Sequence, residues 1–177
     1  MLTLLLGGAR SGKSRFAVSR GREVGGAAVV YIATASAGDA EMAARITRHR
    51  AARPEEWTTI EEPLDLVAAL RKAEGMAPRA VIVDCLTLWL ANLLEEEAEE
   101  ERVLERIGAA AEAAKALGHR CEVVVVSNEV GLSLVPTTAL GRRFRDLHGL
   151  MNQTWAEHAD RVALMVAGLP LWLKQPE

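Results

Sequence analysis

The feature that most constrains this chain is a glycine-rich loop that directly follows its first apolar segment. Residues 7–14 match the pattern G-x-x-x-x-G-K-[ST], with Gly7, Gly12, Lys13 and Ser14 at the defined positions. The glycines let successive backbone N–H groups face a phosphate, Lys13 can reach the β- and γ-phosphates, and the Ser14 hydroxyl can ligate Mg²⁺. An apolar strand before the loop and a helical pattern after it complete the expected context. The sequence therefore predicts a phosphate-binding loop for a nucleoside triphosphate, and a glycine-rich turn without ligand is the weaker interpretation.

Short apolar segments alternate with segments of helical periodicity along the rest of the chain. The predicted strands are 2–6, 28–33, 80–84, 122–127 and 161–167, with 169–173 as a possible edge strand. They are apolar without alternation, which is typical of strands covered on both faces. Helical periodicity is found at 99–117 and 140–158, and the apolar stripe of the second segment is interpreted as core or subunit contact rather than a ligand surface. The alternation predicts an α/β fold with a mainly parallel sheet.

Length, charge and cysteine usage exclude several classes of protein. The 177 residues suit one domain, and the net charge of −3 argues against bulk nucleic-acid binding. No signal peptide is visible, and no stretch reaches the roughly 18 apolar residues of a membrane span. Cys85 and Cys121 lie in or beside apolar runs and are interpreted as reduced core thiols. We expect a cytoplasmic protein.

Acidic residues suggest one metal ligand and one solvated surface. Asp84 ends the apolar strand 80–84, at the edge where ligands bind in parallel sheets, and is the predicted second Mg²⁺ ligand beside Ser14. A helix N-cap is the compatible alternative for Asp84. The acidic run 95–101 is interpreted as a solvated helix start, with metal binding as the weaker alternative.

The segment 39–52 reads as a helix that carries one histidine among several arginines. Arg45, Arg48, Arg50 and Arg53 fall within nine residues of an otherwise acidic chain, and such a cluster suits a polyphosphate. His49 is either a partly buried surface-helix histidine or a nucleophile toward phosphorus. Periodicity and composition leave both interpretations open.

An ordered series of motifs extends over nearly the whole chain. The series is GGARSGKSR (7–15), YIATA (31–35), DAEMAARI (39–46), His49-Arg50, Arg53-Pro54, WTTIE (57–61), DCLT (84–87), SNEVG (127–131), Val135-Pro136, FRD (144–146), Gly149 and Asn152. It resembles the bifunctional adenosylcobinamide kinase/adenosylcobinamide-phosphate guanylyltransferase family of cobalamin biosynthesis. The resemblance implies a P-loop NTPase domain with a RecA-like, mainly parallel sheet and helices on both faces.

The resemblance also implies two activities and a set of site residues. The first activity phosphorylates adenosylcobinamide with ATP or GTP, and the second transfers GMP from GTP through a guanylylated His49 to give adenosylcobinamide-GDP. Lys13 is the second expected catalytic residue. The expected nucleotide contacts are Gly7, Gly8, Ala9, Arg10, Ser11, Gly12, Lys13, Ser14, Thr34, Ala35, Ser36, Arg50, Ala51, Ala52, Arg53, Glu61 and Asp84. The same resemblance implies a homo-oligomer and suggests a trimer.

Three further points complete the sequence-based hypotheses. Asn128 and Glu129 follow the strand 122–127 and either face the site, helping the kinase step, or form a turn held by side-chain hydrogen bonds. The other histidines, at 119, 148 and 158, are interpreted as ordinary. The competing functions are a P-loop kinase for another small molecule and a nucleotide-gated regulatory protein.

Overall fold

The computed structural model describes residues 1–36, 40–51 and 53–176. The strands are β1 (Leu2–Leu6), β2 (Val29–Ala33), β3 (Thr58–Glu61), β4 (Ala80–Asp84), β5 (Glu122–Val126), β6 (Arg161–Val166) and β7 (Leu169–Lys174). The helices are α1 (Lys13–Gly25), α2 (Ala40–Ala51), α3 (Leu66–Glu74), α4 (Leu86–Glu96), α5 (Glu100–Gly118) and α6 (Ala139–His158).

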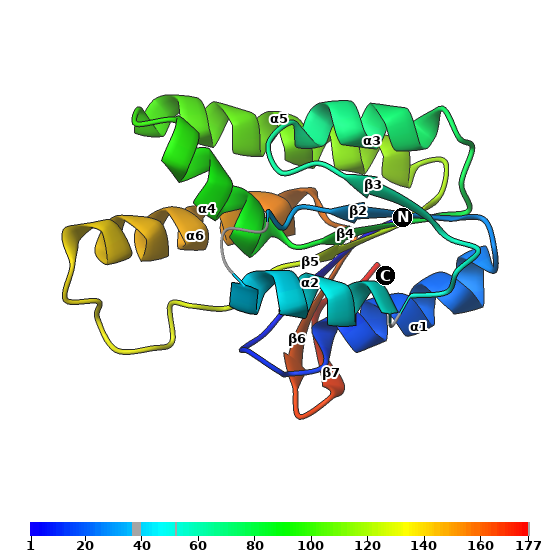
Figure 1. The fold of residues 1–177 in the computed structure, drawn as a ribbon, viewed down its shortest axis with the longest axis horizontal. Helices are drawn as coiled ribbons and strands as arrows, with labels where there is room; N and C mark the ends of the chain where they lie inside the picture. Colours follow the sequence, from blue (N-terminus) through cyan, green and yellow to red (C-terminus); the bar gives the residue numbers. More distant parts are fainter. Residues whose placement is uncertain (37–39, 52, 177) are drawn as a thin grey trace.

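The strands form one twisted sheet in the order β3-β2-β4-β5-β1-β6-β7 (Figure 1). All neighbouring pairs are parallel except β6 and β7, which form an antiparallel hairpin at one edge. Because the six parallel strands run in one direction, the loops that follow them meet at a single edge of the sheet. The predicted α/β P-loop fold with a mainly parallel sheet is confirmed.

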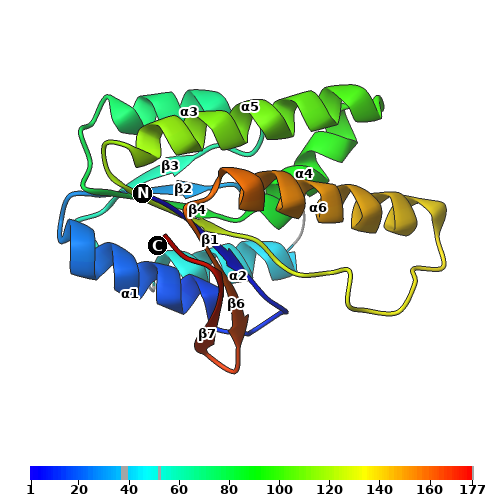
Figure 2. The same ribbon diagram turned by 180° about the vertical axis from the view of Figure 1, so that it is seen from behind.

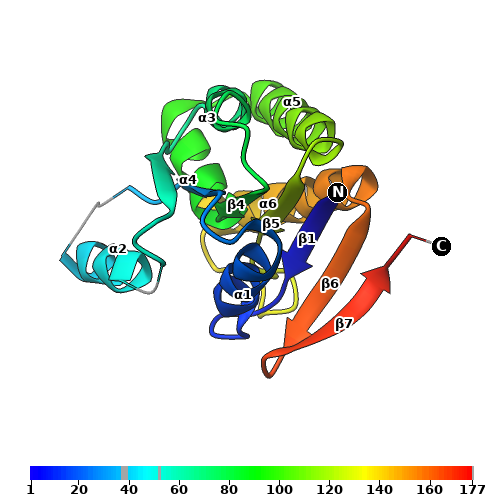
Figure 3. The same ribbon diagram turned by 90° about the vertical axis from the view of Figure 1, so that its right-hand side faces the viewer.

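Helices cover both faces of this sheet. Helices α3, α4, α5 and α6 lie on one face, and α1 and α2 lie on the other (Figures 1 and 3). Seen from behind, the β6–β7 hairpin extends beside α1, away from the α3 and α5 layer (Figure 2). The central strands are therefore buried on two sides, which explains why they are uniformly apolar in sequence.

The two faces of the sheet belong to two separate cores. In β1, Leu2, Leu4 and Leu6 pack toward α3–α6, whereas Leu5 packs toward α1. Successive side chains of a strand alternate between faces, so each central strand contributes to both cores. In β2 this alternation places Tyr31 on the α1 face, where it reaches the candidate site.

Three elements of the structure are absent from the sequence prediction. The edge strand β3 has only four residues, of which only Ile60 is buried, so it carries almost no apolar signal. Helix α3 has only nine residues, which give little helical periodicity. Helix α4 begins with apolar residues two positions after β4 ends, so the sequence shows no clear boundary between strand and helix. The interpretation of residues 95–101 as a solvated helix start holds for Glu100 and Glu101, which lie in the first turn of α5, whereas the run itself begins in the last turn of α4. Some of its acids also pair with arginines, as in the contact between Arg106 and Glu96 at 2.9 Å.

The remaining differences concern boundaries and exposure. The predicted stripe of α6 is buried at Leu147, Met151 and Trp155, but Leu140 is exposed. Cys85 and Cys121 are free thiols, as predicted. Within residues 1–36, 40–51 and 53–176, no helix is long and apolar enough to cross a membrane.

A pair of glycine substitutions tests the packing of α1 on the sheet. A Cβ at Gly25 would lie 2.4 Å from Val29 Cγ2 and 3.2 Å from Ala80 Cβ. We expect Gly25→Ala to lower the free energy of unfolding by about 1–3 kcal/mol, as overpacking does. Gly108→Ala is the matched control, because a Cβ there meets nothing within 4 Å and alanine favours the helix by up to about 1 kcal/mol. Urea unfolding measures both, and equal effects of the two substitutions would contradict the packing described.

Candidate phosphate and nucleotide site

The glycine-rich loop lies between β1 and α1, and its shape depends on the β6–β7 hairpin. Gly7 and Gly12 have φ angles of 150° and 97°. A Cβ at Gly7 would lie 2.6 Å from the Met165 carbonyl oxygen, and one at Gly12 would lie 3.0 Å from Gly168 Cα. The Gly168 N–H also donates to the Ser11 carbonyl oxygen at 2.9 Å. Glycine is therefore required at both positions by backbone conformation and by the close approach of the hairpin.

Lys13 points back into the loop that it follows in sequence. Its side chain is buried, and its Nζ donates to the carbonyl oxygens of Gly7 and Gly8, each at 2.7 Å. The Ser11 hydroxyl lies 3.4 Å from the same nitrogen. The amino end of α1, which begins at Lys13, has no side-chain cap. A buried ammonium and the amino end of a helix both favour an anion at this position.

Asp84 lies at the end of β4 in a cluster with Tyr31 and Arg53. The Tyr31 hydroxyl donates to Asp84 Oδ2 at 2.6 Å, and the Arg53 guanidinium lies 3.7 Å from the centre of the Tyr31 ring. Burial and the neighbouring Asp84 charge raise the pKa of Tyr31 well above its ordinary value, so Tyr31 remains a hydrogen-bond donor. The alternative role of Asp84 as a helix N-cap is not observed, because Cys85 occupies that position of α4.

Thr34 fastens the end of β2 to the end of β4. Its side chain is fully buried, donates to the Cys85 carbonyl oxygen at 2.7 Å and accepts from the Cys85 N–H at 2.8 Å. The Thr34 carbonyl oxygen accepts from the Asn92 amide at 2.8 Å, and the Ser36 hydroxyl contacts the same side chain at 3.2 Å. The side chain of Thr34 thus holds the loop in place, while Ala35 is half-buried and Ser36 is exposed.

Helix α2 carries the predicted histidine and most of the arginine cluster. Arg50 is exposed and pairs with Glu61 at the end of β3, with 3.5 Å between Nη1 and Oε1. Arg53 lies beyond the last residue of α2, and its N–H donates to the Arg50 carbonyl oxygen at 3.1 Å. Residue 52 and the side chains of His49, Arg45 and Arg48 lie outside what the structure describes.

The predicted site residues at the ends of β1 to β4 share one edge of the sheet. Residues 7–14 and 34–36 follow the carboxyl ends of β1 and β2, and Glu61 and Asp84 are the last residues of β3 and β4. Contacts between neighbouring elements connect parts of this edge, including Arg50 of α2 with Glu61 of β3 and Tyr31 of β2 with Asp84 of β4. Ligands in open parallel sheets bind at this edge.

The loop after β5 is attached to the phosphate loop by its backbone. The Glu129 N–H donates to the Gly7 carbonyl oxygen at 3.0 Å, and Glu129 Oε1 accepts from the Gly131 N–H at 2.8 Å. The turn with side-chain hydrogen bonds that we considered for this segment is therefore present. It places Asn128 and Glu129 beside the phosphate loop.

Sequence interpretation missed His148, which lies in a buried polar network. His148 is fully buried, and its Nε2 lies 3.0 Å from the Thr87 hydroxyl oxygen. Burial lowers its pKa from 6.5 to about 4, partly offset by the charge of Glu129. The only available signal was the position of His148 on the same helix face as Met151 and Trp155, which more often indicates an ordinary core residue.

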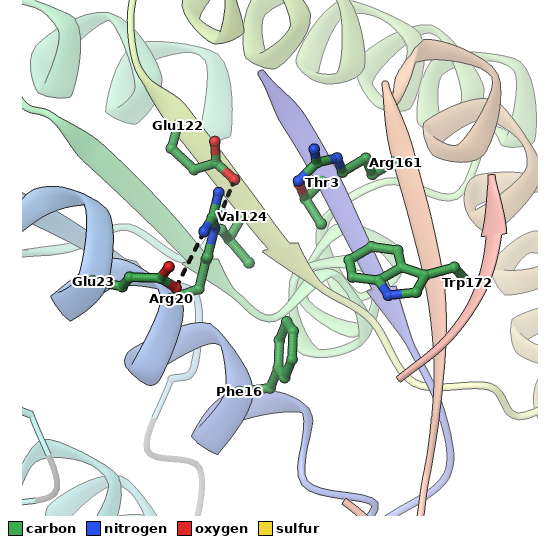
Figure 4. A pocket seen from close by; sticks show the side chains of 8 residues that line it. All are labelled: Thr3, Phe16, Arg20, Glu23, Glu122, Val124, Arg161 and Trp172. Carbon is green, nitrogen blue, oxygen red and sulfur yellow. Dashed lines mark hydrogen bonds and ion pairs between the residues drawn. The ribbon is translucent and has the colours of Figure 1, made fainter. Parts of the chain in front are cut away.

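A separate pocket lies at the opposite end of the central strands. Figure 4 shows it between α1 and the first residues of β1, β5 and β6, with Arg20 paired to Glu122 and Glu23. Its volume of about 120 Å³ is small for a nucleotide, since ligand pockets commonly measure roughly 300–1,000 Å³. Two of its buried polar atoms, Thr3 Oγ1 and Arg161 Nε, have no partner among the described residues. Its size and polarity suit ordered water, and it is not the phosphate site.

Comparison with known proteins gives the site its context. Residues 3–173 match the family described as cobinamide kinase / cobinamide phosphate guanyltransferase. The chain belongs to this family. It is 50% identical to the "bifunctional adenosylcobalamin biosynthesis protein CobP" of Pseudomonas aeruginosa, over 98% of each chain. It is also 40% and 38% identical to the proteins named CobU from Salmonella typhimurium and Escherichia coli, over 98% of this chain and 100% of each relative.

Membership decides among the functions considered from the sequence. The protein is a cobinamide kinase and cobinamide phosphate guanylyltransferase, and so a kinase and nucleotidyltransferase of cobalamin biosynthesis. The matched residues include the phosphate loop, the ends of β2, β3 and β4, and most of the β6–β7 hairpin. A regulatory protein without turnover and a kinase for an unrelated small molecule are both set aside.

The low pKa of His148 predicts a specific dependence of stability on pH. Between its unfolded pKa near 6.5 and its folded pKa near 4, the unfolded chain binds a proton that the folded protein does not. The free energy of unfolding should therefore fall as the pH is lowered through this window. We expect the stability difference between the wild type and His148→Phe to shrink by about 2 kcal/mol between pH 7 and pH 4.5, measured by urea unfolding. Parallel stability curves for the two proteins would contradict a neutral, buried His148.

Proposed function

We propose that the carboxyl edge of the sheet carries both reactions of this enzyme. The observation that carries the proposal is the phosphate loop itself, with the Lys13 ammonium buried against the Gly7 and Gly8 carbonyl oxygens. Triphosphate oxygens can replace these two carbonyl oxygens as the acceptors for Lys13 Nζ. They can also accept from the backbone N–H groups of the loop. In the kinase step, the hydroxyl of adenosylcobinamide attacks the γ-phosphorus of ATP or GTP, and the nucleoside diphosphate leaves.

A magnesium ion fits the donor set of this edge. Ser14 supplies a hydroxyl and Asp84 a carboxylate, which are hard oxygen ligands, and Mg²⁺ is usually held by one or two such groups together with substrate phosphates. When bound, the ion would neutralise phosphate charge.

In the guanylyltransferase step, His49 is the proposed nucleophile. Its neutral imidazole attacks the α-phosphorus of GTP, a P–N bond forms, and pyrophosphate leaves as the P–O bond breaks. A phosphate oxygen of adenosylcobinamide phosphate then attacks the same phosphorus, which restores the imidazole and yields adenosylcobinamide-GDP. Support comes from the position of residue 49 in α2, one residue before Arg50, whose partner Glu61 ends β3 at the same edge.

The proposed contacts with the guanine nucleotide come from the phosphate loop, the segment after β2, the end of α2 and the ends of β3 and β4. They are Gly7, Gly8, Ala9, Arg10, Ser11, Gly12, Lys13, Ser14, Thr34, Ala35, Ser36, Arg50, Ala51, Ala52, Arg53, Glu61 and Asp84. Arg53 and Arg50 can neutralise phosphate charge, whereas Thr34 contributes by holding its loop.

We further propose a homo-oligomer, with one domain in each chain and a cytoplasmic location. Two exposed apolar groups support association: Leu169, Leu171 and Leu173 on the edge strand β7, and Leu132 and Leu134, which are 85% and 93% exposed. Exposed apolar groups of this kind often mark protein interfaces. A trimer is the expected form by family resemblance.

Labelling with GTP carrying ³²P at the α-phosphate tests the nucleophile. We expect the wild type to retain label after denaturation, with the alkali stability and acid lability of a phosphoramidate, and His49→Ala to retain none. His119→Ala is the control, because His119 is exposed at the end of α5, before β5 and away from the site. Equal label in the wild type and His49→Ala, or no label in either, would disprove the guanylyl-histidine.

Substitution of the loop lysine tests the phosphate site independently. We expect Lys13→Ala to lower the rate of cobinamide phosphorylation by at least about 100-fold, because a positioned cation is lost from the transferred phosphoryl group. The measurement is steady-state phosphorylation with saturating ATP, with folding checked by circular dichroism. A rate within threefold of the wild type would show that the phosphates bind elsewhere.

A further inference from the structure

A buried polar network joins α6, α4 and the loop after β5 directly beside the phosphate loop. His148 and Asn152 come from α6, Thr87 from α4, and Ser127 and Asn128 from the loop that follows β5. The Thr87 hydroxyl oxygen lies 3.0 Å from His148 Nε2 and accepts from the Asn128 N–H at 2.9 Å. The Ser127 hydroxyl donates to Asn152 Oδ1 at 2.7 Å. Apolar side chains would fill this space at lower desolvation cost, so the network calls for a reason other than packing.

The hydrogen bonds of the network determine the tautomer of His148. The Asn128 carbonyl oxygen can only accept, so the Asn152 side-chain nitrogen must be the atom that lies 3.1 Å from it. The same nitrogen lies 3.4 Å from His148 Nδ1, which therefore acts as the acceptor. The proton of the neutral ring is then on Nε2 and is donated to the Thr87 hydroxyl oxygen. The low pKa of His148 agrees with this neutral state.

The network acts on the backbone of Asn128 and Glu129. The Asn128 N–H is held by Thr87 and its carbonyl oxygen by Asn152, so the orientation of this residue is set from both sides. The next N–H, that of Glu129, donates to the Gly7 carbonyl oxygen at 3.0 Å. The same carbonyl oxygen accepts from Lys13 Nζ at 2.7 Å. A short chain of hydrogen bonds therefore leads from His148 to the phosphate loop.

We propose that His148 is a positioning residue for phosphoryl transfer, which acts through Thr87 to hold the Asn128–Glu129 backbone against Gly7 of the phosphate loop. His148 is buried and acts through other residues, so it is not a catalytic residue in the strict sense. By holding the Gly7 backbone through the Glu129 N–H, it keeps the start of the phosphate loop in position for the transferred phosphoryl group. The inference rests on the proposed phosphate role of residues 7–14.

The competing explanation is a buried histidine that only stabilises the fold. That role predicts a lower melting temperature with an unchanged turnover number of the folded enzyme. A positioning role predicts that the turnover number falls even where the protein is fully folded. It also predicts that any side chain which restores the bond to Thr87 restores turnover.

Four variants separate these explanations. His148→Phe removes both ring nitrogens at similar size, and Thr87→Val replaces the hydroxyl with a methyl group. His148→Gln retains a side-chain N–H near the position of Nε2. Leu147→Ala is the matched control, because Leu147 is equally buried on α6 but faces the apolar core. We measure kcat and KM for cobinamide phosphorylation at a temperature where each variant is folded, together with the melting temperature.

We expect His148→Phe and Thr87→Val to lower kcat at least tenfold, with less than threefold change in KM for the nucleotide. The double variant should be no slower than the slower single variant, because both substitutions break one chain of bonds. His148→Gln should return kcat to within threefold of the wild type, and Leu147→Ala should lower the melting temperature with kcat retained. If His148→Phe does not fold, Thr87→Val gives the same test.

Two results would overturn the proposal. One is a kcat within twofold of the wild type for both His148→Phe and Thr87→Val. The other is a loss of kcat in Leu147→Ala equal to that in His148→Phe. Lys13→Ala measured alongside shows whether the phosphate loop itself has the proposed role: an inactive Lys13→Ala with fully active His148 and Thr87 variants would reject the positioning role alone.

Discussion

The carbonyl oxygen of Gly7 accepts hydrogen bonds from two parts of the chain that are far apart in sequence. Lys13 Nζ donates from the first turn of α1, and the Glu129 N–H donates from the loop after β5. Gly7 can receive both because it directly follows β1, which lies between β5 and β6 near the centre of the sheet. A side chain at Gly7 would collide with the Met165 carbonyl oxygen of β6. The geometry of the phosphate loop is therefore fixed by the sheet as well as by its own glycines.

The same principle extends along the rest of the edge. The segments that follow neighbouring strands are joined by specific contacts: Thr34 after β2 bonds Cys85 after β4, and Thr87 at the start of α4 bonds Asn128 after β5. Tyr31 adds two contacts on the α1 face. Its hydroxyl donates to Asp84, and the Arg53 guanidinium stacks over its ring. An enzyme with two successive phosphate reactions needs phosphate-binding groups at fixed positions, and these contacts supply that rigidity.

Much of this arrangement could be predicted from the sequence. The central strands are apolar on both faces, so their parallel pairing and the edge shared by residues 7–14 and Asp84 follow from pattern alone. Strand β3 could not be found in this way, because its pairing with β2 rather than its side chains stabilises it. The role of His148 was equally hidden, since its partners Thr87 and Asn152 are distant in sequence or spaced like ordinary core residues. The use of the Thr34 hydroxyl within the protein could not be predicted either, because no sequence pattern shows how a buried hydroxyl is satisfied.

The central claim is that the loop from Gly7 to Ser14 binds the triphosphate and that Lys13 exchanges protein carbonyls for phosphate oxygens. A crystal structure with a non-hydrolysable GTP analogue and Mg²⁺ tests this most directly. We predict phosphate oxygens within hydrogen-bond distance of the N–H groups of residues 8–14, with Lys13 Nζ turned away from the Gly7 and Gly8 carbonyl oxygens toward the β- and γ-phosphates. Phosphates bound at another part of the molecule, or Lys13 unchanged beside a bound nucleotide, would contradict the account.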